Sequence, residues 1–267
     1  MGKGIINAHC HIYPEKIAAK AVASICDFYG LNVNTSGTAA GLVEDCEKYG
    51  VTHYLVHSVA TTPEQVSSIN NFISREASSS RGKFIGFGTL HPDSDDPERD
   101  IEELISLGLR GVKLHPDFQG YSADGPKASR LGEVISGKGL PVLIHCGDTR
   151  YELSNPPQMK VFLDRFPEIP VIGAHFGGWQ HWDEAMEYLA GRENFYVDTS
   201  SCLSFMTPEY AEKLIRSFGV ENVLFGTDYP MWECGDELEL FAKVRLTEQE
   251  RGMILFDNAA KLLGVIS

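Results

Sequence analysis

The sequence predicts an α/β fold, a (β/α)8 TIM barrel that forms one domain over residues 1–267. Two observations lead to this prediction. Eight short apolar runs recur along the chain, and nearly every one is followed by a helical segment; they cover residues 4–12, 51–60, 84–90, 111–115, 141–146, 171–176, 195–201 and 223–228. Several runs are apolar on both faces, as a parallel sheet covered by helices requires. An open doubly wound sheet usually has fewer strands.

The segments between the runs carry helix-start signals. A capping side chain precedes a first-turn proline at residues 62–63, 96–97 and 207–208, and residues 247–250 have the spacing of a capping box. One connection is longer than a minimal strand-helix unit. Residues 13–37 separate the first strand from its return helix and contain an amphipathic segment, residues 15–29. We therefore expect a distorted barrel whose extra helical segment is a candidate lid or oligomer contact.

Composition excludes several classes of partner. The chain has 37 acidic and 23 basic residues, a formal charge of -14, and no cluster of Lys or Arg that could follow a phosphate backbone. We expect no nucleic-acid or membrane partner, and a cytoplasmic protein, because the N-terminus lacks a signal-peptide pattern. The six cysteines are scattered singly, so reduced, buried thiols are expected; Cys10 and Cys146 should point outward, under the helices.

Polar side chains gather where the predicted strands end. His9 and His11 end the first run two residues apart, which places both imidazoles on one face of the strand. Later runs end with further candidates: His115, His145, His175 and Asp228. In a barrel these ends converge on one mouth, which is where barrel enzymes carry their active sites. Burying so many imidazoles without a partner would cost several kcal/mol, so the pattern predicts a metal site.

Imidazole nitrogens with one carboxylate suit zinc, and Mn²⁺, Co²⁺, Fe²⁺ or Ni²⁺ are alternatives. Zinc lowers the pKa of a bound water from 15.7 to near 7. This effect exceeds the ~10²–10⁴-fold contribution of a general base alone. The predicted metal would therefore dominate water activation, while a histidine or aspartate moves protons around it.

The pattern resembles the amidohydrolase superfamily, and most closely the amidohydrolase-related branch that includes aminocarboxymuconate semialdehyde decarboxylase. The resemblance covers nearly the whole chain. It rests on Asn7-Ala-His-Cys-His11, Gly111-Val-Lys-Leu-His-Pro116, Ile144-His145, Gly173-Ala-His175, Gly226-Thr-Asp-Tyr-Pro230 and Asp257-Asn-Ala-Ala-Lys-Leu-Leu-Gly264.

The resemblance implies one metal per chain, with His9, His11, His145 and Asp228 as its ligands. His175 matches the histidine that shuttles protons beside the metal, so His175 and Asp228 are the candidate catalytic residues. Members of the superfamily that hold two metals use a carboxylated lysine from the fourth strand. Lys113 lies in that strand, but a buried cation that pairs with Asp228 or with substrate is its more ordinary role.

Five further residues are candidates for substrate binding: Lys113, His115, Arg150, Trp179 and Tyr229. The guanidinium of Arg150 would offer a bidentate clamp for a carboxylate, and a solvated loop arginine is the alternative. The two aromatic residues would form pocket walls. We assign a structural role to His53 and His57, and either a pocket or a turn role to His91.

Three functions remain open from the sequence. The first is hydrolysis of an amide, lactone or ester bond of a small organic acid by a zinc-activated water. The second is metal-dependent, non-oxidative decarboxylation or hydration of an unsaturated or aromatic carboxylic acid. The modest chain length favours hydrolysis. The third, a non-catalytic metal-binding protein, predicts a closed coordination shell, whereas these ligands emerge at an open mouth. The branch also suggests a homodimer.

Overall fold

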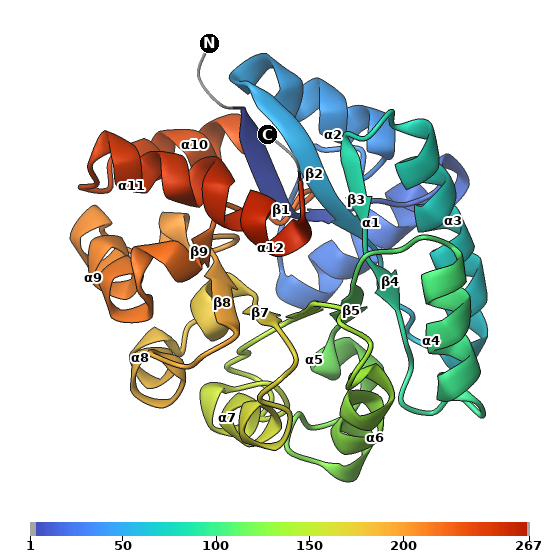
Figure 1. Cartoon of the computed structure of the whole chain (residues 1–267). Coiled ribbons are helices and arrows are strands. Elements are labelled where there is room, and N and C mark those ends of the chain that lie inside the picture. The colour runs from blue at the N-terminus through green and yellow to red at the C-terminus, as the bar shows by residue number, and fades with distance from the viewer. Residues whose placement is uncertain (1–3, 266–267) are drawn as a thin grey trace.

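The computed structural model describes residues 4–265. Short parallel strands form an inner ring, and helices surround it (Figure 1). The strands are β1 Ile5–His11, β2 Val51–His57, β3 Phe84–Gly86, β4 Gly88–Thr89, β5 Val112–Leu114, β6 Val142–Ile144, β7 Val171–Gly173, β8 Phe195–Asp198 and β9 Val223–Leu224. Each lies within one of the eight predicted runs.

The strands form two arcs that close into a barrel. One sheet has the order β1-β2-β3 and the other the order β4-β5-β6-β7-β8-β9. Phe87 separates β3 from β4, so these two strands occupy one position in the ring, and the Phe87 amide donates to Val56 O at 2.9 Å. On the other side the Ala8 amide donates to Phe225 O at 2.8 Å and joins β1 to the end of β9. The predicted (β/α)8 barrel is confirmed.

The helices begin largely where the sequence places a cap. They are α1 Glu15–Tyr29, α2 Ala39–Cys46, α3 Val66–Ser79, α4 Pro97–Ser106, α5 Pro116–Gln119, α6 Pro126–Ile135, α7 Pro156–Arg165, α8 Trp182–Leu189, α9 Pro208–Phe218, α10 Cys234–Ala242, α11 Glu248–Gly252 and α12 Asn258–Leu263. The Asp96 carboxylate caps α4, Thr207 caps α9, and Thr247 forms the predicted capping box. At Thr62 the structure differs, because a 3₁₀ turn over Pro63–Gln65 precedes α3.

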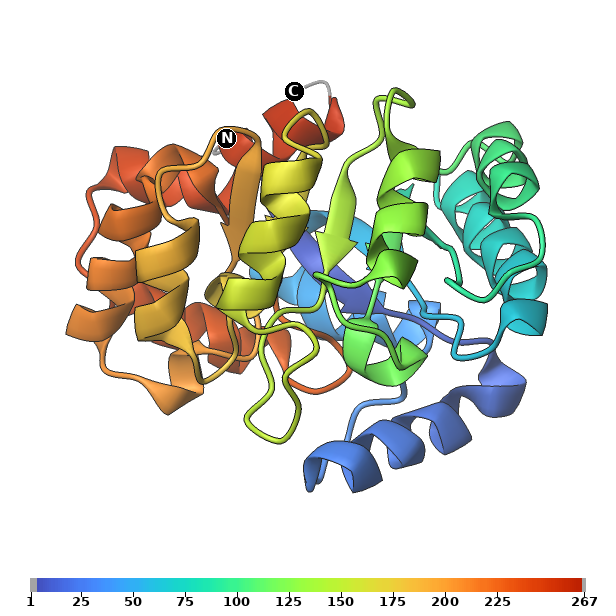
Figure 2. The same ribbon diagram turned by 90° about the horizontal axis from the view of Figure 1, so that it is seen from below.

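The extra helix α1 has the bounds that the amphipathic pattern predicts. Pro14 precedes it, and Gly30 ends it in a left-handed conformation with φ 67°. Figure 2 shows α1 apart from the ring of helices, on the same side as the loop that follows β6. Its buried residues are Ala18 and Val22, whereas Ile17 is 50% exposed.

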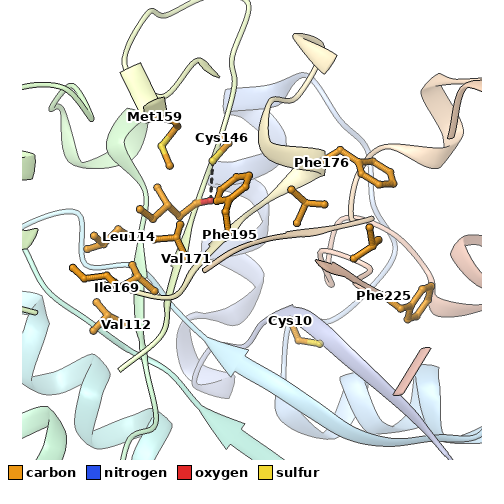
Figure 3. Close-up of a cluster of buried hydrophobic side chains, with 14 of the residues drawn as sticks. Cys10, Val112, Leu114, Cys146, Met159, Ile169, Val171, Phe176, Phe195 and Phe225 are labelled. Atoms are coloured by element: carbon orange, nitrogen blue, oxygen red, sulfur yellow. Dashed lines mark hydrogen bonds between the residues drawn. The ribbon is translucent and has the colours of Figure 1, made fainter. Parts of the chain in front are cut away.

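Two hydrophobic clusters hold the barrel together. The smaller one fills its interior with side chains such as Leu55, Leu143 and Ile172, against Ala259 and Leu263 of α12. The larger one lies between the strands and the outer helices, and Figure 3 shows part of it.

Cys10 and Cys146 belong to this larger cluster, as the alternation of strand residues predicts, and all six cysteines are free thiols. Within the described residues, no helix combines the length and the apolar composition needed to cross a membrane.

Candidate metal centre

The candidate ligands lie at the carboxyl ends of the strands, mostly in the turns that follow them. His9 and His11 belong to β1, and His145 directly follows β6. His175 and Asp228 come after β7 and β9 and have left-handed backbones, with φ 61° and 60°. Such a conformation costs a residue other than glycine about 1–3 kcal/mol, and it persists where surrounding contacts determine it. Here the turns direct both side chains back toward the mouth.

Asp228 stands opposite the two histidines of β1. Its Oδ1 lies 3.2 Å from His9 Nε2 and 3.4 Å from His11 Nε2. Its Oδ2 accepts a hydrogen bond of 2.6 Å from Ser201 Oγ, which in turn accepts one of 2.7 Å from Trp232 Nε1. The carboxylate is therefore held with one oxygen toward the imidazoles.

Three of the histidines use one ring nitrogen to contact an acceptor on the protein. The pairs are His9 Nδ1 with Asp198 Oδ2 at 2.8 Å, His145 Nε2 with Gly147 O at 3.1 Å, and His175 Nδ1 with Ser200 O at 3.0 Å. Carbonyl and carboxylate oxygens only accept, so these nitrogens carry the protons. In each neutral ring the other nitrogen is left with a lone pair.

Those lone pairs face other acceptors. His145 Nδ1 lies 3.1 Å from His175 Nε2, and His9 Nε2 lies 3.2 Å from the Asp228 carboxylate. Two acceptor atoms at such a distance repel each other unless a cation lies beside them. Lys113 Nζ, 3.3 Å from His9 Nε2, is such a cation for the second pair, so the stronger indication of a metal is the pair formed by His145 and His175. Imidazole nitrogens with a carboxylate are also the donor set that zinc takes. The residues of the mouth therefore fit a divalent metal.

Burial and charge set the protonation of this cluster. Burial, with Lys113 adding to it, lowers the pKa of His9 from 6.5 to about 4, and burial also holds the pKa of His145 well below 6.5. Burial alone would raise the pKa of the Asp228 carboxyl, but the neighbouring His9 and His11 outweigh it and hold that pKa well below 3.8. Neutral imidazoles and an ionised carboxylate are the forms that bind metal.

Lys113 lies inside the same cluster and is fully buried. Its Nζ is 3.3 Å from His9 Nε2. Burial lowers the pKa of Lys113 from 10.5 to about 8, although the charges of Asp228 and Asp198 favour the ammonium form. The structure thus places Lys113 inside the histidine cluster, in contact with His9.

A cavity of about 560 Å³, counting its open mouth, lies above these residues. Its lining includes His11, His145, His175 and Asp228. Aromatic side chains make up much of the remaining wall: Tyr29, Phe118, Trp179, Phe205 and Trp232. A concave mouth lined by aromatic side chains, with a few polar groups that converge on it, is typical of a site for a small ligand.

Two of the predicted substrate-binding residues line this cavity. His115 stacks on His145 with ring centroids 3.9 Å apart, and its Nε2 lies 3.3 Å from the hydroxyl of Tyr29. Its Nδ1 accepts from the Phe118 amide, so Nε2 carries the proton and points a donor toward the cavity wall. Trp179 presents a buried indole Nε1 with no hydrogen-bond partner among the described residues.

The other two aromatic or basic candidates lie elsewhere. Arg150 forms hydrogen bonds of 2.6 and 2.9 Å with Asp148, donates to Phe28 O, and stacks 5.0 Å from the ring of Tyr29. It thereby fastens the end of α1 rather than lining the cavity. Tyr229 is fully buried behind the mouth, and its hydroxyl lies 3.3 Å from Ser36 Oγ. The sequence could not place these two, because their partners, such as Phe28 O and Ser36 Oγ, lie far away along the chain.

Four residues of the cluster were not predicted to belong to the site. Asp198 and Ser200 contact both His9 and His175, and Ser201 holds Asp228. Asp198, the one acidic residue of the seventh run, was an available signal. His57, to which we assigned a structural role, lies against the histidines of β1.

A parallel barrel that gathers imidazoles and a carboxylate at the carboxyl ends of its strands defines a class, the metal-dependent barrel enzymes. A model of the amidohydrolase family matches residues 6–265. The chain belongs to this family of metal-dependent enzymes, as the strand-end motifs predicted.

Several solved structures share the fold. An uncharacterized TIM-barrel protein from Bordetella bronchiseptica is 19% identical, with a TM-score of 0.80 over 97% of this chain and 98% of that one. The 5-carboxyvanillate decarboxylase of Sphingomonas paucimobilis is 16% identical, with a TM-score of 0.77 over 98% and 99%. A putative 2-pyrone-4,6-dicarboxylic acid hydrolase from Pseudomonas putida is 18% identical, with a TM-score of 0.73 over 100% of both chains.

Proposed function

We propose that this chain is a metal-dependent hydrolase that acts on an amide, lactone or ester bond of a small organic acid. The observation that carries the proposal is the pair of facing acceptor nitrogens, His145 Nδ1 and His175 Nε2, in the same mouth as the imidazoles of β1 and the Asp228 carboxylate. His9, His11, His145 and Asp228 would hold one zinc ion. Such an ion makes water nucleophilic near neutral pH and polarises a carbonyl.

His175 is suited to move the proton. Its Nδ1–H is fixed on Ser200 O, so Nε2 is the basic nitrogen, and the ring lines the cavity. In the proposed reaction the oxygen of water bonds to the carbonyl carbon of the substrate. The C–N or C–O bond then breaks, and the proton taken at Nε2 is returned to the leaving group. Asp228 is the second group that could take this proton.

The cavity wall supports a carboxylic acid as substrate. Trp179 Nε1 is an unpartnered donor that could receive a carboxylate, and His115 Nε2 could do so if it exchanged its contact with the Tyr29 hydroxyl for the substrate. Two of the proteins with a similar fold are named for aromatic or pyrone carboxylic acids.

The aromatic wall favours a second candidate, non-oxidative decarboxylation or hydration of a planar, unsaturated or aromatic acid. Phe118, Trp179 and Phe205 could stack on such a ring. In this reaction the bond between the ring carbon and the carboxylate breaks, CO2 leaves, and His175 delivers a proton to the carbon. For that step His175 must begin protonated, whereas hydrolysis requires its free lone pair.

Metal analysis and product analysis test the proposal together. We expect one equivalent of metal per chain in the wild-type protein, and its loss in His9→Ala and Asp228→Ala but not in His53→Ala. Two equivalents would favour a carboxylated Lys113. A panel of lactones, amides, esters and aromatic acids then separates the reactions, because hydrolysis releases acid without CO2. Release of CO2 from an aromatic acid would favour decarboxylation over hydrolysis. The oligomeric state is a separate question, and light scattering would test the predicted homodimer.

A further inference from the structure

The last residue of β2 brings another imidazole to the metal cluster. His57 pairs in register with His11 of β1. Leu55, two residues earlier, belongs to the interior cluster of the barrel, so His57 points to the same interior. The whole residue is buried.

His57 lies edge-on against both histidines of β1. Its ring centroid is 4.3 Å from that of His11, at 82°, and 5.0 Å from that of His9, at 68°. Neither of its ring nitrogens has a hydrogen-bond partner among residues 4–265. Buried polar groups are nearly always paired, because leaving one unpaired forfeits its hydration without compensation.

The neighbours of His57 cannot supply this pairing themselves. One nitrogen from each of His9, His11 and His57 lies within 4.8 Å of the other two. His9 donates its single proton to Asp198, and His11 Nδ1 also lacks a partner within the described part of the chain. Three ring nitrogens that converge in this way are a common arrangement for binding a divalent metal.

We propose that His57 is a further ligand of the metal, so that β1 and β2 together supply three imidazoles. This inference rests on the proposed function, because it requires an ion in the mouth. It adds a ligand from the second strand to the set formed by His9, His11, His145 and Asp228. It also accounts for a buried histidine that no protein group satisfies.

The test compares two phenylalanine variants. His57→Phe keeps a flat ring against His9 and His11 but removes both nitrogens. His91→Phe is the matched control, because His91 is also buried with an unpartnered Nε2 and belongs to none of the clusters of potential ligands. Zinc affinity is measured by competition with a chromophoric chelator. We expect the Kd for zinc to rise at least about tenfold in His57→Phe, because even changes in residues that only support a ligand weaken metal binding by about 10–100-fold. In His91→Phe we expect the Kd to stay within about twofold of the wild-type value.

X-ray absorption at the zinc edge provides a reading independent of activity. We expect one imidazole fewer in His57→Phe than in the wild-type protein. An unchanged Kd and an unchanged imidazole count would overturn the inference while leaving the proposed function intact. A wild-type protein that binds no zinc would instead refute the proposed function itself.

A second variant covers the case in which His57→Phe does not fold. His57→Ala leaves room for free imidazole, and added imidazole should restore the zinc affinity and the ligand count. Wild-type affinity in His57→Ala without imidazole would contradict the proposal, as would a loss of affinity that imidazole does not reverse.

Discussion

Glu237 offers a sharp test of how burial near the metal centre affects stability. This residue of α10 is 1% exposed, and neither carboxyl oxygen has a hydrogen-bond partner in the described chain. Burial, together with the charges of Asp228 and Asp236, raises the pKa of Glu237 from 4.5 to about 8. The folded protein therefore holds this proton at neutral pH, whereas the unfolded chain releases it.

The sign and size of the effect follow from proton linkage. Between pH 4.5 and about 8 the unfolded chain binds fewer protons than the folded one, so the free energy of unfolding falls as pH rises. At 1.36 kcal/mol for each unit, the whole shift corresponds to about 5 kcal/mol. Glu237→Gln cannot ionise. Its stability relative to the wild-type protein should therefore rise with pH by up to that amount and level off above about pH 8.

Urea unfolding of the metal-free proteins at a series of pH values from 5 to 9 measures this difference. The Gln amide is also buried without a partner, which adds a difference in the free energy of unfolding that does not depend on pH. The test is therefore how the difference between the two proteins changes with pH. Glu239→Gln, on the exposed side of the same helix, removes a surface pair with Lys243 and should differ from the wild-type protein by less than about 1 kcal/mol throughout. If Glu237→Gln and the wild-type protein kept a constant difference from pH 5 to 9, the reasoning would be wrong.

Three further changes test the mouth. Asp198→Asn should weaken zinc binding about 10–100-fold in a chelator competition, because it removes the charge that orients His9; unchanged affinity would contradict this role. Trp179→Phe keeps the ring but removes the unpartnered N–H, so a small carboxylate ligand should bind about tenfold more weakly by calorimetry; equal affinity would exclude the indole as a donor. Tyr29→Phe loses the hydrogen bond between the Tyr29 hydroxyl and His115, which is worth about 1 kcal/mol. Local opening of α1 should become about fivefold more frequent, so proteolysis within α1 should accelerate by the same factor. An unchanged rate of cleavage would mean that this contact does not hold the helix in place.

The barrel could be predicted because its signals are local. Apolar runs, capping side chains and first-turn prolines each act within a few residues, and the bounds of α1 follow from Pro14, the amphipathic pattern and Gly30. The split between β3 and β4 has no such local signal. It reflects a change of partner, because the Phe87 amide donates to Val56 O of the neighbouring β2 whereas the Gly88 amide donates to Gly111 O, next to β5.

The candidate site divides in the same way. The topology of a barrel brings strand ends together, so His9, His11, His145, His175 and Asp228 could be listed from sequence. In the structure His9 and His11 contact Asp228, and His145 contacts His175. The left-handed backbones of the last two could not be predicted, because they depend on contacts made by distant turns. Arg150 shows the limit most clearly.

A guanidinium just beyond a strand end could clamp a substrate carboxylate. The Arg150 guanidinium instead donates hydrogen bonds to Asp148, two residues earlier, and to the carbonyl of Phe28. Which of these partners an arginine meets is decided by loop geometry, not by residue type.

The sequence pattern of histidines and aspartate does not record the hydrogen-bond acceptors that orient each imidazole ring. One ring N–H group of each histidine donates a hydrogen bond to an oxygen of the protein: Asp198 Oδ2, Gly147 O or Ser200 O. These oxygens therefore determine which ring nitrogen keeps its lone pair. Two of these three partners are backbone carbonyls, which any residue carries and no motif records. A chain with the same histidines in differently shaped turns would therefore present N–H groups where this one presents lone pairs, and it would lose the metal while keeping the motif.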